Sequence, residues 1–388
     1  MHRSRFVAIL IAVVVATFAA VLLLPLANRA PKVLVGMPPV VHRENLYSEA
    51  GAGHFSPATA GALSRIYVPD VKSGDVYVID PDSLRILGSF AAGRHPQHVV
   101  PSYDLRTLWV AGSAAPGRGP GFVMPVDPRT AKPGDIVRVP DAYNLYFTPD
   151  GGSAIIVAEE DRRLDFRDPH TMQFQQTVRT PQCRGINHAD FAIDGSYAIF
   201  SCEFGGNLIK FDVRQRRVID SLKLPPPSMP QDVRIAPNGG LFYIADMMHD
   251  GVFLLDGDRF RPVGFVHTGM GTHGLVISRD GRKLYVANRG SHIVEDRPLG
   301  PGSVSVIDFA TNKVERTWPI PGGGSPDMGN VTADGRYLWL SGRFDNVIYR
   351  IDTADGTIKT IPVGREPHGL AIWPLPGRYS LGHTGIMR

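Results

Sequence analysis

Short apolar runs separated by turn residues fill the chain from about residue 60 onward. Runs of β-branched and aromatic residues predict β-strands. One such strand recurs seven times, at Ile66–Val68, Leu108–Val110, Ile155–Val157, Ile199–Phe200, Phe242–Ile244, Leu284–Val286 and Leu338–Leu340. Asp-Gly or Asn-Gly precedes five of these strands, at 150–151, 194–195, 238–239, 280–281 and 334–335. These dipeptides tolerate the positive φ of tight turns, so each is predicted to close a hairpin.

The strands belong to a repeating unit whose third strand ends in aspartate. These aspartates are Asp80, Asp127, Asp168, Asp212, Asp256, Asp308 and Asp352. Consecutive members lie 41 to 52 residues apart. Seven units of this length predict an all-β fold, a seven-bladed β-propeller with four-stranded blades. Because the aspartate recurs in every unit, we expect it to bond the backbone of the following turn.

The first and last units indicate how the ring closes. The first unit lacks an innermost strand, whereas an extra strand, His368–Trp373, follows the seventh unit. We expect this C-terminal strand to pair into the first blade, which removes exposed sheet edges. The predicted propeller then spans residues 65–373, preceded by a linker at 31–64 and followed by a surface tail at 374–388.

An uninterrupted apolar run precedes the repeats, from Phe6 to Ala27, after a basic start with Arg3 and Arg5. A run of this length suffices to cross a bilayer, and the basic start is expected to stay in the cytoplasm. We therefore expect residues 1–30 to be a signal anchor, with a transmembrane helix at 6–27 that holds the propeller outside the cytoplasm, periplasmic or extracellular. Cleavage as a signal peptide, which would release a secreted protein, is the alternative.

Composition supports this picture and excludes one class of partner. The 42 glycines and 33 prolines exceed average usage, as many tight turns require. The net charge is only +4 and the basic residues are scattered, which argues against nucleic acid as a partner. The two cysteines, Cys183 and Cys202, flank a predicted hairpin within one unit. In an exported protein they are a candidate disulfide, and two buried thiols are the alternative.

The repeat resembles that of a known family. Leu284-Tyr285-Val286-Ala287-Asn288 followed by Ser303–Asp308 is similar to the repeat of YVTN-type (YncE-like) seven-bladed β-propellers, and Ile66–Asp70 and Phe242–Asp246 are looser copies. The resemblance covers roughly residues 60–373. It implies the fold but no single activity, because propellers host many unrelated functions. More distantly, the chain is similar to the haem-binding propeller of cytochrome-type nitrite reductases, which implies a histidine-ligated haem without assigning a ligand here.

Candidate chemistry gathers where the innermost strand of each blade begins, at one mouth of the central channel, called here the upper mouth. The residues at this position are His98, Asn144, His188, Asp232, His273, Asp327 and His368. Four of the seven are histidines, although the chain has only 13. Imidazole and carboxylate suit Zn, Cu, Fe and Mn, so this ring is a candidate metal or ligand site.

The ring residues can also be explained by a structural role that needs no metal. YVTN repeats commonly carry Pro-x-Gly here, as in Pro367-His368-Gly369, where the middle residue packs and hydrogen-bonds. Opposite blades should be too far apart to share an ion. We therefore expect any ion to lie between neighbours, such as His368 with His98 or His188 with Asp232.

Loops between second and third strands should lie at the same mouth. Two of them are enlarged, at 112–121 and 290–302, and long loops on one end of a rigid scaffold often carry function. The same rim should present Arg184, His249, His292 and Arg343.

No hydrolase, zinc-protease, phosphate-loop or C-x-x-C motif occurs in the sequence. We therefore expect an extracytoplasmic, membrane-anchored binding or scaffold protein, whose His-rich upper face binds a small ligand or a protein. The alternatives at this face are a metal-dependent enzyme (an oxidoreductase or a lactonase-like hydrolase) and a haem-handling protein. Lactonase-like propellers hold calcium with acidic residues, so the histidines disfavour that reading. Among cofactors, a transition metal is favoured over haem.

Overall fold

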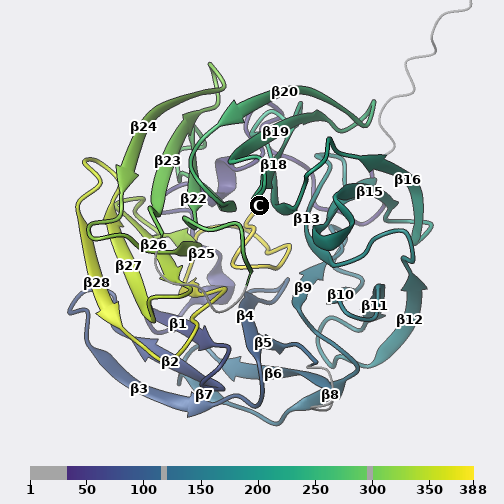
Figure 1. Cartoon of the computed structure of the whole chain (residues 1–388). Coiled ribbons are helices and arrows are strands. Elements are labelled where there is room, and N and C mark those ends of the chain that lie inside the picture. The colour runs from purple at the N-terminus through teal and green to yellow at the C-terminus, as the bar shows by residue number, and fades with distance from the viewer. Residues whose placement is uncertain (1–32, 115–119, 295–299) are drawn as a thin grey trace, which may run out of the picture. The chain divides into compact units, whose positions relative to one another are not determined.

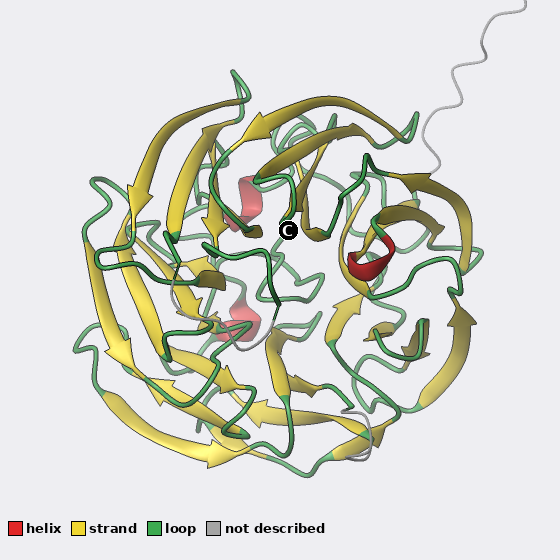
Figure 2. Ribbon diagram, in the orientation of Figure 1, coloured by secondary structure: helices red, strands yellow, loops and turns green. Residues whose placement is uncertain are grey.

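Seven antiparallel β-sheets stand in a ring around a central channel (Figure 1). The structure is a computed structural model and describes residues 33–114, 120–294 and 300–388. Strands make up nearly all of its regular structure, as Figure 2 shows. Three short 3-10 helices also occur in the described residues, η1 (Ser48–Ala50), η2 (Pro57–Thr59) and η3 (Glu203–Gly205). The predicted all-β, seven-bladed propeller is confirmed.

The blades are numbered in ring order, with the strands of each given from the channel outward. Blade 1 contains β29 (Ala371–Trp373), β1 (Arg65–Asp70), β2 (Asp75–Ile79) and β3 (Ile86–Ala91). Blade 2 contains β4 (Pro96–Pro101), β5 (Leu108–Gly112) and β6 (Gly121–Asp127), with β7 (Lys132–Pro133) and β8 (Val137–Val139) both paired to β6. Blade 3 contains β9 (Asn144–Phe147), β10 (Ala154–Ala158), β11 (Arg163–Arg167) and β12 (Phe174–Arg179).

The remaining four blades repeat this plan. Blade 4 contains β13 (Ile186–Phe191), β14 (Tyr197–Cys202), β15 (Asn207–Asp212) and β16 (Arg217–Lys223). Blade 5 contains β17 (Pro230–Ile235), β18 (Phe242–Asp246), β19 (Gly251–Asp256) and β20 (Arg261–His267). Blade 6 contains β21 (Thr272–Ile277), β22 (Lys283–Asn288), β23 (Ser303–Asp308) and β24 (Lys313–Pro319). Blade 7 contains β25 (Pro326–Val331), β26 (Tyr337–Gly342), β27 (Val347–Asp352) and β28 (Ile358–Pro362).

The ring closes as the sequence predicts. Strand β29 pairs antiparallel with β1, with Ile66 opposite Ile372 and Tyr67 opposite Ala371. The C-terminal strand is therefore the innermost strand of blade 1, and the first and last parts of the propeller share one sheet.

The repeated aspartates bond the turns that follow the third strands, as expected. Oδ1 of Asp80 accepts from the backbone N–H of Ser83 at 2.8 Å, and Oδ1 of Asp168 accepts from Thr171 at the same distance. Equivalent bonds form at Asp127, Asp212, Asp256, Asp308 and Asp352. Their role is structural because each carboxylate satisfies donors of its own turn.

Residues 374–388, expected as a surface tail, instead enter the channel from its lower end, where the innermost strands finish. The N–H of Phe147 donates to Leu381 O at 3.0 Å, and the N–H of His383 donates to Leu145 O at 2.9 Å. Most side chains of the segment are buried, including Leu375, Leu381, Ile386 and Met387. Burying these apolar groups is favourable, and the open centre of the ring provides the space. This segment is called the channel tail below.

The described part of the expected linker, from residue 34 to residue 64, packs against the same lower face. Leu34 N donates to Asp194 O at 2.9 Å, and Leu46 N donates to Pro237 O at 2.8 Å. The Tyr47 hydroxyl donates to Ile235 O at 2.8 Å. Among the described residues no helix has the length and hydropathy needed to cross a membrane. The expected transmembrane segment, residues 6–27, lies outside them.

Candidate metal centre in the channel

A repeated irregularity of the innermost strands presents the ring residues to the channel. In blades 2, 4, 5, 6 and 7 the pairing of the first two strands shifts register within the first few residues of the innermost strand. In blade 4 the shift falls between Ile186 and Ala189 and so includes His188. Such bulges free residues from the ladder and re-aim their side chains.

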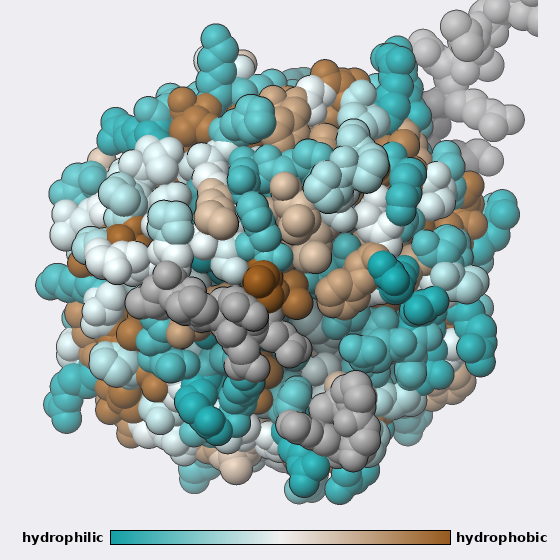
Figure 3. Space-filling model, in the orientation of Figure 1, coloured by the Kyte–Doolittle hydropathy of each residue, from teal (hydrophilic) through white to brown (hydrophobic). Residues whose placement is uncertain are grey.

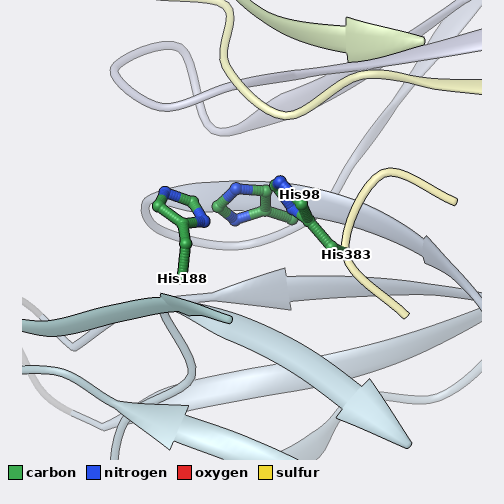
Figure 4. Close-up of side chains that lie close together, drawn as sticks. All are labelled: His98, His188 and His383. Atoms are coloured by element: carbon green, nitrogen blue, oxygen red, sulfur yellow. The ribbon is translucent and has the colours of Figure 1, made fainter. Parts of the chain in front are cut away.

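Three imidazoles meet in the channel. His98 belongs to β4 and His188 to β13, while His383 comes from the channel tail (Figure 4). One ligand atom from each lies within 4.8 Å of the other two, and all three side chains are fully buried. The ring centroids of His188 and His383 are 4.9 Å apart, and those of His98 and His383 are 5.2 Å apart.

Hydrogen bonding fixes the protonation of His98. Its Nδ1 lies 2.8 Å from the backbone carbonyl oxygen of Tyr143. A carbonyl oxygen only accepts, so Nδ1 carries the proton and Nε2 of the neutral ring has a free lone pair. This Nε2 is buried and has no hydrogen-bond partner among the described residues. A metal ion bound by this cluster would satisfy such an orphaned acceptor.

Asn144 holds the other two rings. Its Nδ2 lies 3.2 Å from Nδ1 of His188 and 3.2 Å from Nδ1 of His383, while its Oδ1 accepts from Leu145 N at 2.8 Å. Because the amide nitrogen can only donate, both Nδ1 atoms act as acceptors. The amide protons therefore occupy the lone pairs that a metal cation would take.

Asp232 lies on the other side of His383. Its Oδ1 is 3.4 Å from Nε2 of His383 and is held by Arg234 at 2.6 Å. Because Nε2 of His383 has no hydrogen-bond partner among the described residues, the carboxylate acts on this ring through its charge.

All three imidazoles are neutral near pH 7. Burial lowers the pKa of His98 to about 4. Burial is also the main cause that holds the pKa of His188 and of His383 well below the usual range. Neutral imidazole is the form that binds metals, so these side chains need not lose a proton to do so.

His273 and Asp327 belong to a separate group. Arg289 Nη2 lies 2.7 Å from Nε2 of His273 and 3.0 Å from Oδ1 of Asp327, and Nδ1 of His273 lies 2.7 Å from the same oxygen. Burial alone would raise the pKa of Asp327, but Arg289, His273 and His368 together hold it well below its usual range. The two ring nitrogens of His273 therefore lie against Arg289 and Asp327, and His273 is not part of the three-imidazole cluster.

His368 lies between the two groups. Its ring centroid is 4.7 Å from that of His98, and its Nε2 is 3.7 Å from Oδ2 of Asp327. Its Nδ1 is buried and finds no hydrogen-bond partner in the part of the chain that the structure describes. The expected neighbour pair His98 and His368 is thus in contact, although the three-residue cluster replaces His368 with His383.

The upper mouth carries charges of opposite sign on opposite sides. On blade 4, Glu203 accepts from Asn187 Nδ2 at 2.7 Å and from Gln231 Nε2 at 3.0 Å. Burial and the neighbouring Glu203 raise the pKa of Glu159 on blade 3 well above its usual range. Across the mouth stand Arg289 and Arg343, both buried.

Of the predicted rim residues, only Arg343 lies against the channel. Arg184 is exposed and bonds Phe204 O, His249 lies 3.1 Å from Asp246, and His292 lies 2.8 Å from Asp250. The face toward the viewer in Figure 3 is mostly hydrophilic, with hydrophobic residues in small groups. Parts of both enlarged loops, residues 115–119 and 295–299, lie outside the described residues.

Cys183 and Cys202 form a disulfide between the segment before β13 and the end of β14. Both sulfurs are buried. The bridge thereby ties together the two segments that carry His188 and Glu203.

Two residues of the imidazole cluster and its surroundings, His383 and Tyr143, were not identified from the sequence. His383 lies outside the repeat, so the period that identifies ring residues does not reach it, although the apolar residues around it signal burial. Tyr143 acts on His98 through its carbonyl oxygen, for which no side-chain signal exists.

Fold and site together define a seven-bladed β-propeller with a buried imidazole cluster in its channel. The chain belongs to the YncE-like β-propeller family, whose model matches residues 25–377. A comparison with curated proteins gave no match.

Solved structures with very different activities share the fold. They include hydrazine synthase of Kuenenia stuttgartiensis, with 18% identity, a TM-score of 0.57, and coverage of 70% of this chain and 87% of that chain. A putative 6-phosphogluconolactonase from Bacteroides uniformis has 15% identity and a TM-score of 0.63, over 79% of this chain and 98% of that chain. The dihydro-heme d1 dehydrogenase NirN has 15% identity and a TM-score of 0.57, over 79% of this chain and 75% of that chain. Identities this low support the fold alone.

Proposed function

We propose that this protein is an extracytoplasmic propeller that binds a transition-metal ion in its channel through His98, His188 and His383. The observation that carries the proposal is the cluster of three buried imidazoles with one ring nitrogen of each within 4.8 Å of the others, in which Nε2 of His98 has no hydrogen-bond partner among the described residues. Burying a polar atom without a partner is unfavourable, and a bound cation would remove that cost.

The three imidazole ligands limit which metal ions are expected to bind. Three neutral imidazoles suit Cu or Zn, whereas Mg and Ca prefer oxygen ligands. Affinity for nitrogen sites rises towards Cu(II) along the first-row divalent ions. Among divalent ions we therefore expect copper to bind more tightly than zinc.

A second candidate function is a metal-dependent enzyme at the same site. Three protein ligands leave a coordination position open for water or substrate, which is typical of catalytic zinc sites and less so of structural ones. The bound ion would act as a Lewis acid there. The chain's own contribution would be to place the three rings and to hold them neutral by burial, while the Asn144 amide would have to leave the lone pairs that it occupies.

Haem fits the imidazole cluster poorly. The centroids of His98, His188, His368 and His383 are spaced 4.7 to 5.7 Å apart where they contact one another. Rings in such contact leave no room for a macrocycle between them. The described interior therefore favours a bare ion over the histidine-ligated haem that the distant resemblance implies.

The location outside the cytoplasm rests on two features. The apolar run from Phe6 to Ala27 follows a basic start, as in a signal anchor. The Cys183–Cys202 disulfide is typical of oxidising compartments.

Metal analysis of the full-length protein tests the proposal. Protein stripped with EDTA and reloaded with Cu(II) or Zn(II) should retain about one equivalent after desalting. His98→Ala, His188→Ala and His383→Ala should each lose most of it, whereas His170→Ala, at a ring that is 64% exposed, should not. Less than about 0.1 equivalent in the wild type would contradict the proposal.

A further inference from the structure

Two buried amide side chains on neighbouring blades turn towards one carboxylate. Asn187 of β13 and Gln231 of β17 are each the second residue of their innermost strand and lie within its register shift. Nδ2 of Asn187 donates to Oε2 of Glu203 at 2.7 Å, and Nε2 of Gln231 donates to Oε1 at 3.0 Å. Because a carboxylate oxygen only accepts, Glu203 fixes which way both amides point.

This arrangement leaves the oxygens of both amides without a donor. Oδ1 of Asn187 and Oε1 of Gln231 are buried and have no hydrogen-bond partner among the described residues. The nitrogen and oxygen of one amide are about 2 Å apart, so each of these oxygens lies within about 5 Å of the Glu203 carboxylate. An unpaired acceptor in the interior is unfavourable, and a donor bound at this point would remove that cost.

Glu203 adds a negative charge to these two acceptors. It is 5% exposed and begins η3, where its own N–H donates to Gly185 O at 2.8 Å. The side-chain bonds that it accepts from Asn187 and Gln231 come from neutral amides, and no ion pair within the described ranges includes it. A carboxylate has about four lone-pair sites, so Glu203 can accept a further hydrogen bond.

We propose that Asn187, Gln231 and Glu203 form a binding site at the upper mouth of the channel for an ammonium group, either the free ion or the end of a small primary amine. Three oxygen acceptors, one of them charged, match the N–H donors and the positive charge of such a group. Calcium fits poorly, because it takes about six to eight oxygen ligands. The site stands whether or not a metal binds to the imidazole cluster.

Gln97 on blade 2 provides an internal comparison. It is also the second residue of its innermost strand, β4, and lies within a register shift. Its Oε1 is likewise buried and without a partner in the described part of the chain. Its Nε2, however, donates to the hydroxyl of Ser113 at 2.9 Å instead of to a carboxylate. Gln97 therefore offers the buried acceptor without the charge, and we expect it to hold no cation.

Calorimetric titration of full-length, metal-free protein with ammonium chloride tests the site, with potassium chloride and tetramethylammonium chloride at matched ionic strength as comparisons. Both comparison cations carry the same charge without N–H donors, so they should bind at least about tenfold more weakly than ammonium. Ethylammonium chloride identifies the source of the group. Its binding would assign the end of a primary amine, whereas binding of ammonium alone would assign the free ion.

Gln231→Met and Asn187→Leu each remove one amide at nearly constant volume and should weaken ammonium binding at least about tenfold. Gln97→Met removes the same group from blade 2 and should leave ammonium binding unchanged. His383→Ala should abolish metal binding and leave ammonium binding intact, which separates the two sites.

Melting curves establish that each variant is folded, and the comparison of ammonium with potassium in the wild type carries the test if Gln231→Met and Asn187→Leu are not. Equal binding of ammonium and potassium, unchanged ammonium binding by Gln231→Met, or no ammonium binding by the wild type would overturn the proposal. The last result would show that water alone satisfies the two amides.

Discussion

Nδ1 of His98 donates a 2.8 Å hydrogen bond to the carbonyl oxygen of Tyr143, which lies immediately before the first strand of the next blade. The bond sets the tautomer of His98 and turns its Nε2 lone pair towards the channel. The backbone carbonyl of Tyr143 thus keeps Nε2 of His98 deprotonated, which is the state that a metal ligand requires. The rest of the cluster depends on Asn144 and on the channel tail.

Asn144→Leu should destabilise the protein by about 2–4 kcal/mol, because it leaves the two Nδ1 acceptors of His188 and His383 and the N–H of Leu145 unpaired in the interior. Urea denaturation of the metal-free protein measures this. Asn238→Leu, at an exposed turn, is the control and should cost about 1 kcal/mol or less. Equal effects of the two changes would show that the amide does not hold the rings.

Arg388→Gln should loosen the channel tail. Its guanidinium lies 2.6 Å from Oδ1 of the fully buried Asp190, and breaking a buried pair by removing one partner costs about 3–5 kcal/mol. Hydrogen exchange of residues 374–388 should accelerate, and metal affinity should fall through His383. Arg378→Gln removes the same charge from the same segment, where the side chain donates to Pro39 O and has no ion pair among the described residues, and exchange should stay close to wild type. Unchanged exchange in Arg388→Gln would show that other contacts hold the tail.

The sequence predicted what the repeat encodes and missed what lies outside it. The repeat period predicts the number of blades, the closing strand β29 and the turn aspartates. It does so because each copy of the unit forms the same strands and turns. His98, His188 and the other ring residues are found in the same way. The channel tail has no copy elsewhere, and its position depends on packing against Leu145 and Phe147 of blade 3 and Asn330 of blade 7.

The expected surface position of the tail was wrong. Residues 374–388 follow the last strand of the repeat, but Leu375, Leu381, Ile386 and Met387 recur along the segment and are all buried. The sequence could not predict how the ring residues group together. His273 and Asp327 contact Arg289, and Asp232 contacts Arg234, and the spacing of these residues along the chain does not indicate these contacts.

Removal of the disulfide should lower stability without unfolding the propeller. Cys183 and Cys202 are 19 residues apart, and closing a loop of this length stabilises by about 3 kcal/mol in the chain-entropy account. A reductant should therefore lower the melting temperature of the wild type and leave that of the Cys183→Ser, Cys202→Ser double variant unchanged. A wild type insensitive to complete reduction would contradict this.

Asp70 should make stability fall as pH rises. Burial and the neighbouring Asp75 raise the pKa of Asp70 to about 8, against 3.8 as the ordinary value. Between these values the folded state binds one more proton than the unfolded state, so unfolding free energy decreases with pH by up to about 1.4 kcal/mol per unit. Asp70→Asn should lose this slope between pH 5 and pH 8 in urea denaturation, whereas Asp135→Asn, at an exposed loop, should keep it. Parallel curves for wild type and Asp70→Asn would refute the assignment.

The most direct test of the metal site is anomalous diffraction from crystals of the full-length protein grown with Cu(II) or Zn(II). We expect one anomalous peak in the channel, about 2.0–2.2 Å from a ring nitrogen of each of His98, His188 and His383, with the Asn144 amide displaced from the lone pairs that it now occupies. Density that shows the Asn144 amide still bridging His188 and His383, with any metal peak elsewhere, would contradict it.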